Sequence, residues 1–121
     1  MSALSAFNTQ LIRFFQDLSE TFPEEKDIKM ALEALEGAKK INPRLIVDLF
    51  REHVYNDLAE AIRTEDVPTI IAVAKRKIAT QFNEIMPALS IFEKHWPSLD
   101  DGNRAAIFKY LKVLIVLCEK V

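Results

Sequence analysis

The sequence has very little of the residue types that bend or cross-link a chain. Among its 121 residues are two glycines, Gly37 and Gly102, and one cysteine, Cys118. So few glycines remove the usual material for phosphate-binding loops and hairpin turns. A single cysteine can form neither an internal disulfide nor a cysteine-based zinc cluster, which favours a reducing, intracellular setting. These absences are typical of helices joined by short connections.

Targeting and membrane signals are also missing. The first residues show no basic region followed by an apolar stretch, so they do not indicate a signal peptide, and no segment reaches the roughly 18 uncharged apolar residues of a membrane span. The net charge of −2 and the isoelectric point near 5.7 give no overall attraction to nucleic acid or anionic membranes. We therefore expect an intracellular protein that is neither secreted nor membrane-bound.

What the sequence does contain is the composition of an ordered globular protein. Half of the residues are hydrophobic and 28% are charged, which excludes the low-hydrophobicity pattern of disorder. The length suits one core, and no repeat or long linker divides the chain. We expect a single helical domain over residues 1–121.

Apolar residues recur at steps of three and four, which predicts a series of amphipathic helices. The first runs from about Ser2, its cap, to Glu20. The second begins at Pro23, a tolerated first helical position, and ends near Lys39 or Lys40. Asn42 and Pro43 form a clear start for the third, whose apolar period continues over Leu45, Ile46, Leu49, Phe50, Val54, Leu58 and Ile62, with a break near Tyr55, Asn56 and Asp57.

The second half of the chain follows the same pattern. Asp66 and Pro68 repeat the start signal for a helix that Pro87 must kink or end, because an interior proline removes a hydrogen bond and clashes with the preceding turn. A short helix with Leu89, Phe92 and Trp96 follows. The last helix, from about Asp101 to Lys120, has almost no polar face beyond Lys109, Lys112 and Lys120.

A helix that is apolar on nearly all sides is normally buried on most of them. The last helix is therefore either the central helix of the fold or one that meets another chain. Together these segments predict an all-α fold, a compact bundle of five to six helices with a strongly apolar C-terminal helix.

The residues that carry chemistry are few and scattered. His53 and His95 belong to no pattern with metal-ligand spacing. Apolar surroundings would raise the pKa of the Cys118 thiol, which argues against a nucleophile. The stretch from Asp100 to Asn103 lacks the alternating oxygen ligands of a calcium loop and is better explained as a turn and helix cap. We expect no catalytic residue, no metal ligand and no cofactor.

Two groups of residues are candidates for binding. Aromatic side chains beside the last helix suggest a contact with a protein partner or a second copy, and the candidate interface is Phe92, Trp96, Phe108, Lys112 and Val116. Val116 lies on the stripe that should face water, so an exposed valine there would indicate an interface. The second group, Lys75, Arg76 and Lys77, forms a candidate phosphate-contacting cluster, with Lys39, Lys40 and Arg44 expected nearby.

The segment Phe92-Glu93-Lys94-His95-Trp96, followed by Asn103-Arg104, Ile107-Phe108-Lys109-Tyr110-Leu111 and Leu114, resembles the C-terminal signature of short helical proteins encoded by large DNA viruses of algae and other protists. The stretches Phe7-Asn8-x-Gln10-Leu11 and Ala38-Lys39-Lys40-Ile41-Asn42-Pro43-Arg44 are compatible with it, although Phe108 stands where tryptophan is expected. The resemblance implies an intracellular viral protein, a virion component or a host-directed adaptor, located in the host cytoplasm or the virion. It carries over no site residues.

We therefore predict a non-enzymatic helical protein-interaction module that binds a protein partner or self-associates through its C-terminal helix. The alternative is a nucleic-acid-associated factor that uses the cluster from Lys75 to Lys77. An enzyme with a site assembled from scattered residues is the third possibility.

Overall fold

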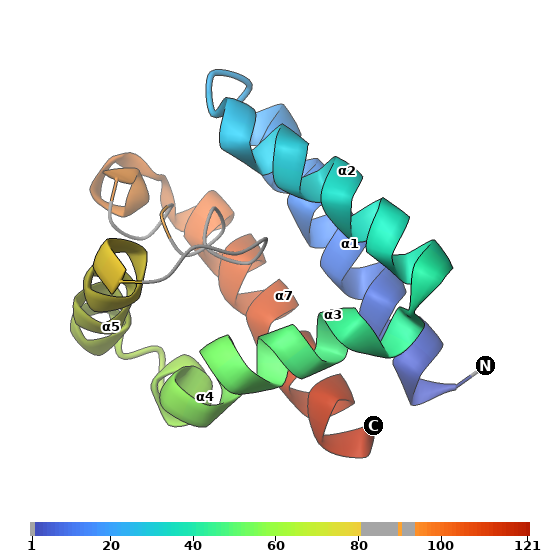
Figure 1. The fold of residues 1–121 in the computed structure, drawn as a ribbon. Coiled ribbons are helices and arrows are strands. Elements are labelled where there is room, and N and C mark those ends of the chain that lie inside the picture. The colour runs from blue at the N-terminus through green and yellow to red at the C-terminus, as the bar shows by residue number, and fades with distance from the viewer. Residues whose placement is uncertain (1, 81–89, 91–93) are drawn as a thin grey trace.

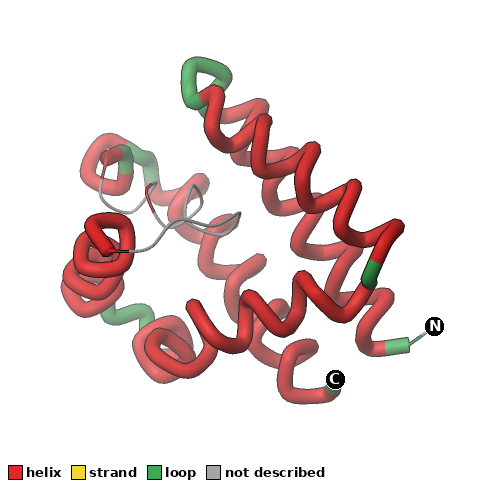
Figure 2. Tube along the Cα trace, in the orientation of Figure 1, coloured by secondary structure: helices red, strands yellow, loops and turns green. Residues whose placement is uncertain are grey.

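The computed structural model describes residues 2–80, 90 and 94–121, and every regular element in these ranges is helical. The all-α fold predicted from the sequence is confirmed. The α-helices are α1 (Ala3–Thr21), α2 (Lys26–Ile41), α3 (Pro43–Phe50), α4 (Asn56–Arg63), α5 (Val67–Thr80) and α7 (Asp101–Lys120) (Figure 1). Short connections join α1 to α2 and α2 to α3, as Figure 2 shows. A π-helical segment, Arg51–Tyr55, links α3 to α4, and a 3-10 turn, Trp96–Ser98, precedes α7.

Side-chain caps fix three of the helix starts at the predicted places. Oγ of Ser2 accepts a hydrogen bond from the backbone N–H of Ser5 at 3.1 Å, and Oδ1 of Asn42 accepts one from the N–H of Arg44 at 3.1 Å. At the start of α7, Oδ1 of Asp100 accepts from the N–H of Asn103 at 2.7 Å. Each cap satisfies a backbone donor that has no partner inside its helix. Asp100 to Asn103 is thus a turn and cap.

One predicted boundary was wrong. Pro23 does not begin α2; it lies in a turn, and the helix starts three residues later at Lys26. The turn is held because Phe22 is buried and stacks on the ring of His95, while Glu25 accepts a hydrogen bond from the same ring. The third predicted helix is interrupted close to the predicted place, because the π-helical segment Arg51–Tyr55 separates α3 from α4, which begins at Asn56.

The core forms where α1 meets its neighbours. Helix α1 packs against α7, α2 and α3, while α7 also contacts α4. The largest buried side chains include Phe7, Phe15 and Phe50, and the rings of Phe7 and Phe50 meet edge to face at 5.1 Å. The remaining buried apolar residues belong to the same cluster. The predicted helix end at Pro87 and the short helix through Leu89 and Phe92 lie outside the described residues.

Candidate interaction surface

Helix α7 is buried along one face and open along another. The buried face consists of Ile107, Phe108, Leu111, Leu114, Ile115 and Cys118, at the helical spacing that meets α1. Val113 and Val116 lie on the open face, and Val116 is 48% exposed. Val116 therefore faces water, as predicted. The two valines, bordered by the exposed Lys109 and Lys120, are named here the α7 strip.

The predicted aromatic surface beside α7 is not on the surface. Trp96 and Phe108 are both buried, and their rings meet edge to face at 5.4 Å. Arg104 covers the outer side of Trp96, with its guanidinium carbon 5.3 Å from the ring centre and its Nη2 donating to the Trp96 carbonyl at 2.8 Å. These aromatics fill the core under the 3-10 turn, so their assignment to an interface was wrong. Phe92 lies outside the described residues.

Lys112, the remaining member of the predicted interface, is engaged within the chain. Its Nζ lies 2.6 Å from Oε2 of Glu65, which is in the turn between α4 and α5. The pair is half-exposed on both sides, so its contribution is that of a surface ion pair. Lys112 therefore ties α7 to that turn.

The basic cluster is divided by the geometry of α5. Lys75 and Arg76 are exposed, but Lys77 is buried and its Nζ lies 2.5 Å from Oδ2 of Asp57 on α4. Successive residues on a helix point about 100° apart, so three consecutive cations cannot share one face. Lys77 is thus not available to phosphates, and its assignment was wrong.

The other cations expected beside this cluster lie elsewhere. Lys39, Lys40 and Arg44 stand at the junction of α2 and α3, on the opposite side of the molecule from α5 (Figure 1). The six basic residues therefore do not form one patch.

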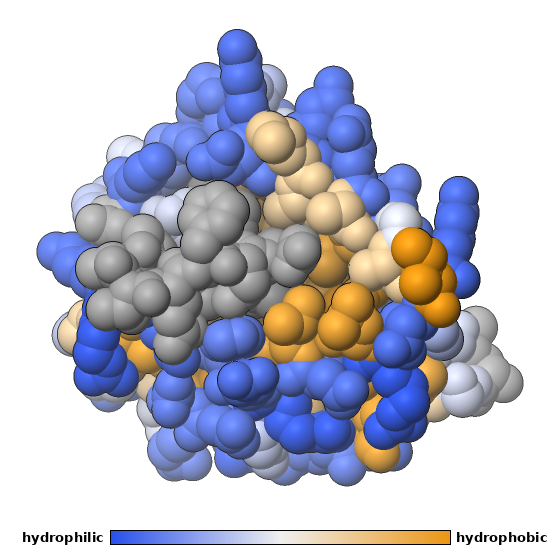
Figure 3. Space-filling view, in the orientation of Figure 1, coloured by the Kyte–Doolittle hydropathy of each residue, from blue (hydrophilic) through white to orange (hydrophobic). Residues whose placement is uncertain are grey.

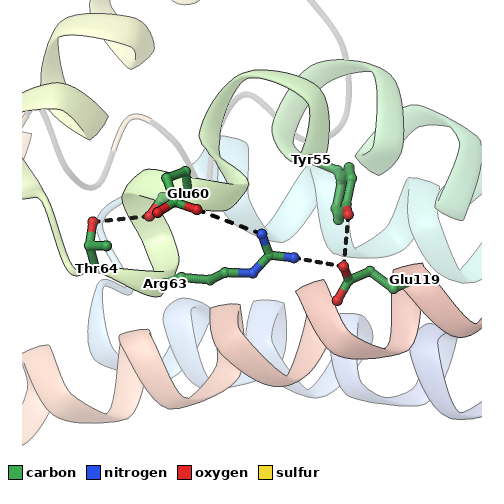
Figure 4. Close-up of polar contacts among 5 residues, drawn as sticks. All are labelled: Tyr55, Glu60, Arg63, Thr64 and Glu119. Atoms are coloured by element: carbon green, nitrogen blue, oxygen red, sulfur yellow. Dashed lines mark hydrogen bonds and ion pairs between the residues drawn. The ribbon is translucent and has the colours of Figure 1, made fainter.

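A polar cluster joins the end of α7 to α4 and the π-helical segment (Figure 4). Oε2 of Glu119 accepts from the hydroxyl of Tyr55 at 2.9 Å and from Nη2 of Arg63 at 2.7 Å, and Arg63 also lies 3.8 Å from Glu60. The hydrogen bond from Tyr55, and next the contact with Arg63, lowers the pKa of the Glu119 carboxyl. These groups satisfy one another, which fits a clamp between helices better than a reactive centre.

The chemistry-bearing residues do not converge either. Among the residues that the structure describes, no group of three or more His, Cys, Asp or Glu side chains is placed to hold a metal ion. His95 donates from Nε2 to Glu25 at 2.8 Å, and His53 lies half-buried on the π-helical segment. Cys118 is buried, and burial raises the pKa of its thiol, as the sequence predicted.

Among the side chains that the structure describes, the largest exposed apolar ones gather on α2 and α3, a surface that the sequence did not predict as an interface. Ile41 is 88% exposed, Met30 66% and Leu45 44%. Figure 3 shows apolar atoms gathered over these two helices on one face of the molecule. We define this surface, the α2–α3 band, as Met30, Ala34, Ala38, Ile41, Leu45 and Leu49; Ala34 is also exposed, and Ala38 and Leu49 are half-buried.

The spacing of residues in the sequence indicates the α2–α3 band, although the overall composition of α2 does not. Met30, Ala34, Ala38 and Ile41 follow one another at steps of four, four and three, which places them on one face of α2. The buried face of the same helix is a different one, made by Ile28, Ala31 and Leu35. The apolar period of the third helix predicts Leu45 on the buried face, but Ile46, Val47 and Phe50 form that face. Two apolar stripes on one helix thus mark both a core and a surface.

Comparison with known proteins adds no relative. No family model, no curated protein and no solved structure matches this chain. The resemblance to proteins of large DNA viruses therefore stays a prediction. Within residues 2–80, 90 and 94–121, no helix is both long enough and apolar enough to cross a membrane.

Proposed function

We propose that this chain is a non-enzymatic helical module that binds a protein partner through the α2–α3 band. The observation that carries the proposal is the exposure of Ile41, which is 88% open to solvent at the junction of two helices, with Met30 and Leu45 exposed beside it. Single exposed apolar residues are common on protein surfaces, but apolar side chains grouped on one face are typical of contact sites.

The shape of the band suits a helix of the partner. Large side chains stand at Met30 and Ile41, with only the small residues Ala34, Gly37 and Ala38 between them on that face. Small residues let another backbone approach closely, while the larger ones pack on either side of it. Full burial of a side chain such as Ile41 or Met30 stabilises a complex by about 1.5–3 kcal/mol. A few such residues are enough to act as the anchors of an interface.

The α7 strip is a second candidate, supported by the exposure of Val113 and Val116. The lysines that border the α7 strip oppose the self-association predicted from the sequence. Lys109 and Lys120 border the strip at either end, so a symmetric pairing of two copies brings lysine close to lysine in either orientation. Like charges facing each other cost free energy. The α2–α3 band therefore carries the main proposal, and a role as a virion component or adaptor belongs to the same proposal.

The experiment compares Ile41→Asp with Glu36→Lys, a change at an exposed position of α2 outside the band. Each protein is produced with a tag in source cells, and its partners and mass are measured by affinity recovery and light scattering. We expect Ile41→Asp to lose at least one partner that the wild type and Glu36→Lys both retain, with all three proteins equally stable. Retention of every partner by Ile41→Asp would overturn the proposal.

A further inference from the structure

A cleft of about 190 Å³ opens between the second half of α1 and the first half of α7. Its floor and walls are apolar and aromatic, formed by Phe14, Leu18, Phe22, Leu99 and Ile107. Polar groups stand around it, namely Asp17, Glu20, Thr21, Asn103 and Tyr110. The cleft is smaller than the roughly 300–1,000 Å³ of pockets for drug-sized ligands. It therefore has room for a single long side chain.

The charged groups at the cleft are both acidic. Asp17 and Glu20 come from the last turns of α1, and neither has an ion-pair partner among the residues that the structure describes. The hydroxyl of Tyr110 donates to Oδ2 of Asp17, and this hydrogen bond, with burial adding to it, raises the pKa of Tyr110. Asp17 is thus held in place by a neutral donor. The charge of Arg13, one turn earlier on α1, also acts on Tyr110, but the structure records no ion pair between Arg13 and Asp17.

The backbone of α1 adds to the negative potential. The C-terminal end of a helix carries a partial negative charge, which a basic side chain in the last turn often offsets. The last turn of α1 contains no basic residue. On the other wall, Asp101 lies in the first turn of α7 and Asp100 caps it, so the partial positive charge of that helix end is offset.

Aromatic rings complete the environment. The ring of Phe14 stacks on that of Tyr110, with centroids 5.2 Å apart and an interplanar angle of 27°. Aromatic faces attract cations, and apolar walls take up the methylene stem of a lysine or arginine side chain. A basic side chain with an alkyl stem is therefore favoured by the carboxylates, by the C-terminal end of α1 and by the aromatic walls.

We propose that the cleft between α1 and α7 binds the side chain of a lysine or arginine presented by a partner protein. The apolar walls receive the alkyl stem, and Asp17 and Glu20 pair with the charged end at the mouth. This site is separate from the α2–α3 band, because no residue of the band lines the cleft. The inference therefore does not rest on the function proposed above.

The probe for the test is Nα-acetyl-arginine methylamide, with the lysine counterpart and the uncharged citrulline counterpart alongside. Each is titrated into the full-length ¹⁵N-labelled chain at low salt, and amide chemical shifts are followed. We expect saturable shifts at Glu20, Thr21, Asn103 and Tyr110 with at least one of the basic compounds and none with citrulline. The absence of saturable shifts with both basic compounds, or equal shifts with citrulline, would overturn the proposal.

Substitutions locate the site. Glu20→Gln removes one carboxylate at an exposed position and should weaken binding about fivefold, the scale of one exposed ion pair. Glu33→Gln, at an exposed acidic position of α2, is the matched control and should leave the affinity unchanged, as should Ile41→Lys in the α2–α3 band. If Glu33→Gln or Ile41→Lys weakens binding as much as Glu20→Gln does, the cleft is not the site.

Discussion

Helices α2 and α7 expose their apolar side chains in the reverse order to the one that their compositions predict. Helix α7 is the more apolar segment of the sequence, yet it hides most of its apolar side chains and exposes mainly Val113 and Val116. Helix α2 has the composition of an ordinary surface helix, yet Met30 and Ile41 on it are the most exposed large apolar side chains of the described part of the chain. The exposure of apolar side chains on a helix is therefore better predicted from the number of its apolar faces than from its total hydrophobicity.

The difference follows from what covers each helix. Helix α7 packs against α1 and α4, and Ile107, Leu111 and Leu114 are among its buried residues. Helix α2 packs against α1 through Ile28, Ala31 and Leu35, which leaves the stripe through Met30 and Ile41 without a neighbour from α1. An apolar stripe that stays exposed in the described structure is a candidate for contact with another molecule.

The largest expected effect comes from comparing the stability cost of a substitution on the buried face of α7 with one on its exposed face. Leu114→Ala removes a fully buried side chain and should lower the free energy of unfolding by about 2–5 kcal/mol, because a cavity is left beside α1. Val116→Ala, two residues further on the open face, should change it by less than about 0.5 kcal/mol. Urea denaturation followed by circular dichroism measures both. Equal losses for the two variants would mean that the outer face of α7 is covered in the folded protein.

A smaller effect tests whether Gly37 makes helix α2 less stable than it could be. Gly37 is an exposed glycine inside α2, and a Cβ atom placed there meets nothing within 4 Å. Gly37→Ala should therefore raise the free energy of unfolding by about 0.5–1 kcal/mol, since glycine loses more backbone entropy in a helix than alanine. Thermal and urea denaturation measure the gain. A loss of stability would show that the chain itself needs a glycine at this place.

The smallest effect concerns the start of α2 and depends on pH. The hydrogen bond from His95 lowers the pKa of Glu25 from its ordinary value of 4.5, against the opposing effect of burial, and the charge of Lys94 adds to it. Because the folded-state pKa is lowered, this carboxylate stabilises the protein above about pH 4.5, and the stabilisation is lost as the pH falls through the folded-state pKa.

The variant Glu25→Gln should thus be less stable than the wild type near pH 6, with the difference shrinking toward pH 3. Urea denaturation over this pH range measures it, and Glu24→Gln, at the exposed neighbouring glutamate, controls for the change of charge. A difference between Glu25→Gln and the wild type that stays constant down to pH 3 would contradict the role of the His95 contact.

Local signals in the sequence predicted much of the fold. Ser2, Asn42 and Asp101 lie at or beside helix starts in the structure, because a cap depends on residues within three positions of it. Cys118 is buried and Val116 exposed, as the spacing of α7 predicted.

The candidate site was predicted less well, because it depends on contacts between distant segments. Trp96 and Phe108 meet across the turn before α7, and Lys77 turns inward to Asp57 on α4. Spacing shows which residues share a face but not which face meets the core. For this reason the stripe through Met30 and Ile41 was missed.

The most direct test of the central claim compares the two exposed surfaces in source cells. A photo-crosslinking amino acid is placed at Met30 in the α2–α3 band, at Val116 in the α7 strip and at Glu36, an exposed position outside both. We predict protein adducts at Met30 that Ile41→Asp abolishes, and far fewer at Val116 and Glu36. Adducts at Val116 alone, or equal yields at all three positions, would contradict the assignment of the contact surface to α2 and α3.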